Sequence, residues 1–171
     1  MTKAILVEQS VLECRADALV NTVNCQGFMG KGVALEFARD LRFKSDGTQP
    51  SLEEDYKNRC SLPESSPDKV RVGVPYIYVL PQLSLEPPRF IVNFPTKNCY
   101  QSGSHIEWVE AGLERLVGLV ETYRMSSIAM PALGCGNGGM RWQAVEPLIE
   151  AFSRSVDIPV YVALPGSARR P

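Results

Sequence analysis

Short apolar and β-branched runs recur along the chain, and segments with a helical spacing of apolar residues lie between them. The short runs, each bounded by Pro, Gly or charge, predict strands over residues 3–7, 18–23, 69–80, 89–94, 127–131 and 160–164. The helical spacing predicts helices over residues 32–41, 52–60, 105–123 and 142–154. This alternation indicates a three-layer α/β/α domain, in which ligands bind beyond the carboxyl ends of the strands.

Two of the predicted helices begin with a capping-box spacing. Ser104 stands three residues before Glu107, and Ser51 stands three residues before Glu54. In such a pair the hydroxyl and the carboxylate each accept a hydrogen bond from a free N–H group at the helix start. We therefore expect both serines to cap their helices.

Two glycine-rich loops each follow a predicted strand and precede a predicted helix. The first runs from Gly27 to Gly32, after a strand end that carries Asn21 and Asn24. The second covers residues 130–139. Glycine lets the backbone come close to a ligand, and the free N–H groups and dipole of a helix start favour phosphate. Two such loops on one chain suggest a ligand with a diphosphate in its middle.

The composition is typical of a globular protein that needs neither disulfides nor metal. Of the 171 residues, 44% are hydrophobic and 22% are charged, which suits one domain with its own core. Because the net charge is only −1, a nucleic-acid substrate would have to be recognised at a local site. No apolar run approaches the roughly 20 residues that span a membrane. The five cysteines form no CxxC pair, which favours reduced thiols in the cytoplasm and no metal site.

Four blocks of sequence, taken in order, resemble the macro domain, an ADP-ribose-binding α/β/α module: VNTVNCQGFMGKGVALEF (20–37), IVNFPTK (91–97), EAGLERL (110–116) and PALGCGNGGMRW (131–142). The resemblance is closer to the DarG branch, whose macro domain removes ADP-ribose from DNA and counteracts the DarT toxin. It implies a mixed, roughly six-stranded sheet. It also implies a single macro domain over residues 1–166, while the residues themselves indicate a loose tail over 167–171.

The same resemblance implies the partners of the chain. They are ADP-ribose or an ADP-ribosylated substrate, ADP-ribosylated single-stranded DNA and a DarT-like toxin, with no cofactor and no membrane. We expect a monomer, because neither heptads nor a long apolar stripe is visible in the sequence.

The resemblance also implies three catalytic residues: Lys97 as the catalytic lysine, Asn24 near the distal ribose, and Asn21 as the residue that orients the loop. The implied ADP-ribose-binding residues are Asn21, Asn24, Gly27, Met29, Gly30, Lys31, Gly32, Val33, Thr96, Leu133, Gly134, Cys135, Gly136, Asn137 and Gly138. From the residues alone, the two asparagines could instead tie down the loop. Lys31 could equally be a solvated residue at a helix start. Phe28 and Met29 could line the distal ribose, and packing under the loop explains them equally well.

Lys97 could assist hydrolysis at C1 of the ribose in two ways. As an amine it could attack the aldehyde of the ring-opened sugar. As an ammonium it could protonate or polarise the leaving group. Residues 136–139 contain no Asp or Glu, which favours a lysine-dependent reaction over a pair of carboxylates.

Two departures from the family pattern bear on the substrate. Ser10 stands about where the family has an Asp that contacts the adenine amino group. After Lys97 the chain continues Asn98-Cys99-Tyr100-Gln101, which is less basic than the DarG pattern, and Tyr100 is a candidate for stacking on a base. A non-catalytic ADP-ribose reader and a hydrolase of O-acyl-ADP-ribose or ADP-ribose-1''-phosphate stay open as alternatives.

Overall fold

The computed structural model describes residues 3–81 and 86–164, and these residues form one mixed sheet flanked by helices. The six strands have the order β1-β6-β5-β2-β4-β3. Only β3 runs antiparallel to its neighbour. The strands are β1 (Ile5–Val7), β2 (Ala18–Asn24), β3 (Tyr76–Val79), β4 (Phe90–Lys97), β5 (Ile128–Pro131) and β6 (Val160–Ala163). The helices are α1 (Gly32–Arg39), α2 (Leu52–Cys60), α3 (Ile106–Thr122) and α4 (Trp142–Ser155), with short 3-10 turns η1 (Val11–Glu13) and η2 (Leu41–Phe43).

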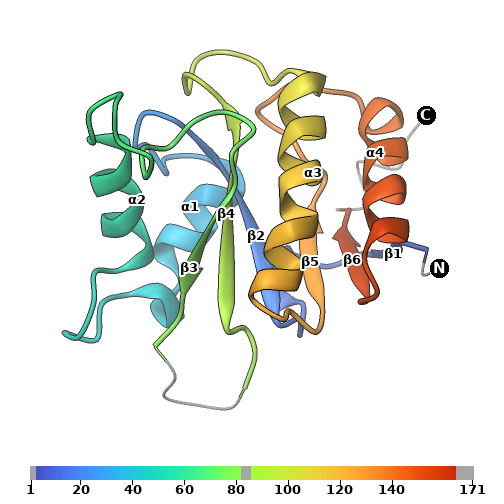
Figure 1. Ribbon diagram of the computed structural model, residues 1–171, viewed down its shortest axis with the longest axis horizontal. Coiled ribbons are helices and arrows are strands. Elements are labelled where there is room, and N and C mark those ends of the chain that lie inside the picture. The colour runs from blue at the N-terminus through green and yellow to red at the C-terminus, as the bar shows by residue number, and fades with distance from the viewer. Residues whose placement is uncertain (1–2, 82–85, 165–171) are drawn as a thin grey trace.

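The sheet is covered on both faces, which confirms the predicted α/β/α architecture. Figure 1 shows α1 and α2 on one side of the sheet and α3 and α4 on the other. Alternate residues of β2 enter the two cores: Val20 packs with the α3 and α4 side chains, whereas Leu19 packs with those of α1 and α2. Burial on both faces is usual for parallel strands. The tail predicted at residues 167–171 lies outside the described residues.

The strand predicted over residues 89–94 is longer in the structure, because β4 continues through Pro95 to Lys97. Proline lacks a donor and is tolerated at irregular positions of a sheet. The pairing of β2 with β4 shifts register at this point: Val23 pairs with Pro95, but Asn24 pairs with Lys97. This irregularity places Asn24 beside Lys97 at the carboxyl edge of the sheet.

The strand predicted over residues 69–80 is mostly wrong, since only Tyr76–Val79 form β3. Gly73 interrupts it with a φ of +68° and lies against α3, where an added Cβ would approach the Trp108 carbonyl oxygen to 3.1 Å. Its N–H donates to the Pro95 carbonyl at 3.0 Å. Apolar content alone did not reveal this turn.

One of the two predicted capping boxes is confirmed and the other is wrong. Ser51 and Glu54 form the capping box of α2. The N-cap of α3 is His105, and no side chain caps it. Ser104 instead packs against the second glycine loop, where its N–H donates to the Gly138 carbonyl at 2.9 Å.

Candidate functional site

The carboxyl ends of β2, β4 and β5 meet at one edge of the sheet, which faces the top of Figure 1. Asn24 is the last residue of β2, and its side chain holds the first glycine loop by hydrogen bonds. Its Nδ2 donates to the Phe28 carbonyl at 2.8 Å, and its Oδ1 accepts from the Gln26 N–H at 2.8 Å and from the Tyr56 hydroxyl at 2.9 Å. The Asn24 side chain therefore sets the shape of the loop.

Asn21 lies deeper in the sheet and is fully buried. Its Nδ2 donates to Oδ1 of Asn93 on the neighbouring strand at 2.9 Å. The remaining Asn21 Oδ1 and Asn93 Nδ2 have no partner within the described part of the chain. Sequence reasoning missed Asn93 as a site residue. A polar amide inside the apolar run 91–94 was the available signal.

The first glycine loop leads into an α1 start that no side chain caps. Lys31 is the N-cap of α1, is exposed, and makes no side-chain cap hydrogen bond. Gly27 and Gly32 have φ values of +84° and +57°, which favour glycine. Open N–H groups at a helix start, together with the helix dipole, favour an anion at such a position.

The remaining residues predicted for this loop differ in exposure. Met29 is only 5% exposed and packs in the core under the loop, so its contact with a ligand is limited. Val33 is half-buried against the same core. Gly30 has open space where a side chain would be.

The second glycine loop faces the first. A Cβ on Gly32 would lie 2.8 Å from Nδ2 of the exposed Asn137, so the two loops come within contact distance. A Cβ on Gly138 would lie 2.3 Å from the Gly134 carbonyl oxygen, which makes glycine a steric requirement at position 138. Gly136 has open space around it. The strand-side end of the loop is fixed by Leu133, which is fully buried.

Lys97, the last residue of β4, is half-buried beside Asn24. Its Nζ donates to the Tyr100 carbonyl at 3.2 Å. Thr96, the preceding residue, is buried. The structure thus brings the predicted lysine, the predicted asparagine and the first glycine loop together.

Cysteine chemistry does not explain the site. Burial raises the pKa of the Cys135 thiol to about 11 and that of Cys25 to about 12, so both thiols stay protonated at neutral pH. Neither glycine loop contains a carboxylate. In the described ranges, no cluster of three or more His, Cys, Asp or Glu side chains could hold a metal ion.

Ser10 lies near a carboxylate from α1. Its hydroxyl caps the 3-10 turn η1 and donates to Oε2 of Glu36 at 3.2 Å. Glu36 is exposed, so this carboxylate is accessible to a ligand next to Ser10. Sequence reasoning noted Ser10 but missed Glu36.

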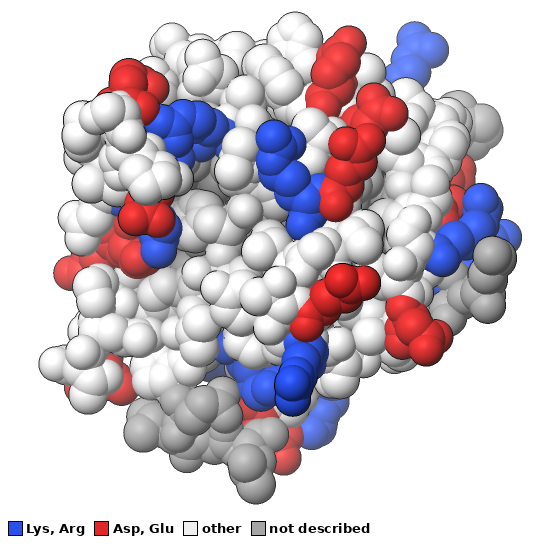
Figure 2. Space-filling view, viewed as in Figure 1, with Lys and Arg blue, Asp and Glu red and all other residues white. Residues whose placement is uncertain are grey.

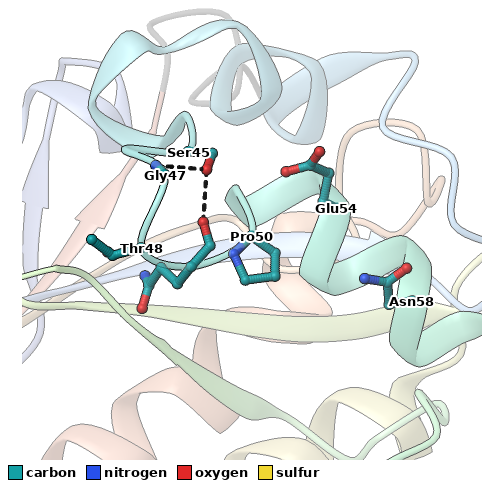
Figure 3. A pocket seen from close by; sticks show the side chains of 7 residues that line it. Ser45, Gly47, Thr48, Pro50, Glu54 and Asn58 are labelled. Carbon is teal, nitrogen blue, oxygen red and sulfur yellow. Dashed lines mark hydrogen bonds between the residues drawn. The ribbon is translucent and has the colours of Figure 1, made fainter.

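Two hollows differ in their relation to these residues. One of about 500 Å³ opens at the start of α2, where Ser45, Thr48, Glu54 and Asn58 surround it, away from every predicted site residue (Figure 3). The other, of about 370 Å³, adjoins the site, because Gln26 and Asn98 line it together with Lys69 and Arg71.

Comparison with known proteins gives consistent matches. A family model described as Macro domain matches residues 20–149. The DNA ADP-ribosyl glycohydrolase of Thermus aquaticus is 39% identical over 160 residues, which cover 93% of this chain but only 40% of that protein. The solved macrodomain of Thermus aquaticus DarG has a TM-score of 0.80 and 36% identity, covering 95% of this chain and 98% of that chain. Thermosipho africanus DarTG in complex with ADP-ribose has a TM-score of 0.83 and 29% identity, covering 99% of this chain and 44% of that chain.

Proposed function

This chain belongs to the macro domain family, and we propose that it binds ADP-ribose and hydrolyses the bond that links ADP-ribose to a DNA base. The names of the similar proteins support this activity: a DNA ADP-ribosyl glycohydrolase and a DarTG bound to ADP-ribose. The observation that carries the proposal is the placement of Lys97 beside Asn24, next to the two facing glycine loops.

The diphosphate is held by backbone rather than by a cluster of cations. The uncapped start of α1 and the open space at Gly30 and Gly136 offer N–H groups to it. Lys31 adds one positive charge at the same helix start. At the adenine end, the hydroxyl of Ser10 and the carboxylate of Glu36 take the place of the family's Asp.

Hydrolysis breaks the bond between C1 of the distal ribose and the base. Water supplies the hydroxyl that remains on C1, and the departing base gains a proton. We assign that proton transfer to Lys97, because it ends β4 beside Asn24 at the edge of the sheet where the glycine loops lie. The amine that attacks a ring-opened sugar remains the alternative chemistry for the same residue.

The two asparagines act through the loop. Asn24 is only 7% exposed and uses both ends of its amide on the loop and on Tyr56, so it is a positioning residue. Asn21 and Asn93 form a buried polar pair behind it. This assignment replaces the catalytic role expected for the two asparagines with a structural one at the same site.

The decisive experiment measures release of ADP-ribose from an ADP-ribosylated single-stranded oligonucleotide. We expect turnover by the wild type and none by Lys97→Ala, with ADP-ribose affinity retained in both. Lys3→Ala, which removes an exposed lysine away from the two loops and Lys97, is the control. Binding of ADP-ribose without any cleavage by the wild type would leave a reader. Release of acetate from O-acetyl-ADP-ribose without action on DNA would favour the hydrolase of small derivatives.

The wider setting is also part of the proposal. We infer a DarT-like toxin as the source of the modified DNA, a monomeric macro domain over residues 1–166, and a cytoplasmic location. All five cysteines are free, which agrees with a reducing compartment. In the described ranges, no helix has the length and apolar character needed to cross a membrane.

A further inference from the structure

Phe28 and Tyr100 form an exposed aromatic pair beside Lys97. Their ring centroids lie 5.0 Å apart and the ring planes are inclined by 64°. Phe28 is 56% exposed and Tyr100 is 49% exposed. Within residues 3–81 and 86–164, the other exposed large hydrophobic side chains are aliphatic: Ile5, Leu6, Leu41 and Val79. Phe28 and Tyr100 are therefore the aromatic members of this exposed set.

The pair is held in position by backbone contacts. The Phe28 carbonyl accepts from Asn24 at 2.8 Å. The Tyr100 N–H donates to Oε1 of Gln26 at 3.1 Å, and its carbonyl accepts from Lys97 at 3.2 Å. In the described structure, neither the Phe28 nor the Tyr100 side chain makes a hydrogen bond to either loop. Exposure of two aromatic rings to water is unfavourable, and this points to a ligand that covers them.

We propose that Phe28 and Tyr100 form the nucleobase subsite of an ADP-ribosylated DNA strand. The inference rests on the proposed function. In that function Lys97 stands at the bond between the ribose and the base, and Tyr100, whose carbonyl accepts a hydrogen bond from Lys97, lies next to that bond. A nucleobase offers a flat π-face, and stacking on aromatic side chains is the usual way proteins hold an unpaired base.

The charge next to the pair favours a nucleic acid over an apolar partner. The hollow of about 370 Å³ beside Gln26 carries Lys69 and Arg71 on its wall. Lys69 lies 3.3 Å from a carboxylate oxygen of Glu64. Arg71 donates only to backbone carbonyls and pairs with no acidic side chain among the residues described. Its uncompensated charge suits a backbone phosphate next to the stacked base. The face seen in Figure 2 shows both signs of charge interspersed.

The test compares Phe28→Ala, Tyr100→Ala and the double variant with the wild type. For cleavage of the ADP-ribosylated oligonucleotide we expect KM to rise by at least about fivefold for each single variant, with kcat nearly unchanged. Affinity for free ADP-ribose stays at the wild-type level. Tyr100→Phe, which keeps the ring, restores the KM. Leu41→Ala removes an apolar side chain of η2 that is more exposed than either ring, and it serves as the control.

Four other outcomes would overturn the inference, and they are distinguishable. Wild-type KM in both alanine variants would reject the subsite while leaving the glycohydrolase intact. Equal loss of free ADP-ribose binding would show that the rings merely support the loops. If the wild type cleaves no DNA linkage, the proposed function itself fails. If the alanine variants then lose affinity for an ADP-ribosylated peptide, the pair is a protein contact instead.

Discussion

At the amino ends of β2 and β4, Asp17 collects hydrogen bonds from Arg89 and from the Ser126 N–H, at distances of 2.5 to 2.8 Å. From the middle of the same strands toward their carboxyl ends, Asn21 and Asn93 each keep one buried amide atom without a protein partner in the described structure. Ser104, which follows β4, leaves its buried hydroxyl likewise unpaired there. One end of the sheet satisfies its polar groups, and the other carries polar groups that packing does not use. We therefore expect stability to depend mainly on the amino end and function on the carboxyl end, and variants at each end should separate the two.

The largest expected effect is on catalysis at the carboxyl end. Lys97→Ala should lower kcat for the ADP-ribosylated oligonucleotide by at least about 100-fold, the usual scale of a lost general acid. The melting temperature should stay within about 1 °C of the wild type, because a half-buried side chain with one hydrogen bond contributes little to stability. A kinetic assay paired with thermal unfolding checks both. A large loss of stability in this variant would contradict the expectation that the carboxyl end serves function rather than stability.

At the amino end the effects should be reversed. Asp17→Ala removes the partner of Arg89, and breaking a buried ion pair costs about 3–5 kcal/mol. Because the Arg89 side chain is 39% exposed, we expect a smaller loss in the free energy of unfolding, about 2–3 kcal/mol. Urea unfolding measures it, and kcat per folded molecule should not change.

The control for that variant is Arg15→Ala. It breaks the ion pair with Glu86, whose two side chains are 79% and 72% exposed. Such surface pairs contribute about 0–1 kcal/mol. Equal losses for Arg15→Ala and Asp17→Ala would show that the amino end has no special role in stability.

Gly138→Ala tests whether the second loop needs glycine for its shape. The new Cβ would lie 2.3 Å from the Gly134 carbonyl oxygen, so the loop must shift. We expect a loss of about 1–3 kcal/mol in unfolding free energy, together with weaker ADP-ribose binding measured by calorimetry. Gly118→Ala, on the exposed face of α3 with nothing within 4 Å, is the control and should stabilise by about 0.5–1 kcal/mol. Unchanged ADP-ribose affinity in Gly138→Ala would remove the second loop from the binding site.

The loss of stability at acid pH should depend on the same hydrogen bonds of Asp17 at the amino ends of β2 and β4. Burial pushes the pKa of Asp17 upward, but the hydrogen bonds from Arg89 and Ser126 outweigh it and leave the folded pKa below the ordinary value. A depressed folded pKa gives stability that is present above the unfolded pKa of about 4 and is lost as the pH falls through the folded one. Urea unfolding between pH 7 and pH 3 should therefore show a smaller pH-dependent loss in Asp17→Asn than in the wild type. Parallel curves would contradict this.

The elements followed from periodicity, but the contacts that complete the site did not. The apolar alternation and the glycine loops predicted both faces of the sheet and the edge where the loops meet. The continuation of β4 through Pro95 depends on its pairing with β2, in which β4 inserts the extra residue Thr96, and the local sequence does not reveal this. Ser104 has the spacing of a cap, but it packs against Gly138 instead, and its N–H donates to the Gly138 carbonyl. Phe28 and Tyr100 are distant in sequence, so their pairing appeared only in the folded chain.

The smallest expected effect concerns the adenine end. The Ser10 hydroxyl donates to Glu36, so this carboxylate can accept a hydrogen bond from the adenine amino group. Glu36→Gln removes the charge but keeps the shape. For an exposed charged hydrogen bond we expect ADP-ribose affinity to fall about two- to tenfold, measured by calorimetry.

An analogue that carries hypoxanthine in place of adenine makes this prediction specific. It presents a carbonyl where adenine has its amino group, so the Glu36 carboxylate repels it, whereas the side-chain amide of the variant could donate to it. Glu36→Gln should therefore bind the analogue no worse than the wild type does, while Glu114→Gln, an exposed charge on α3, changes neither affinity. Equal losses for both ligands would show that Glu36 only orders Ser10 and η1. The carboxylate would then belong with the structural groups, as Asp17 does at the opposite end of the sheet.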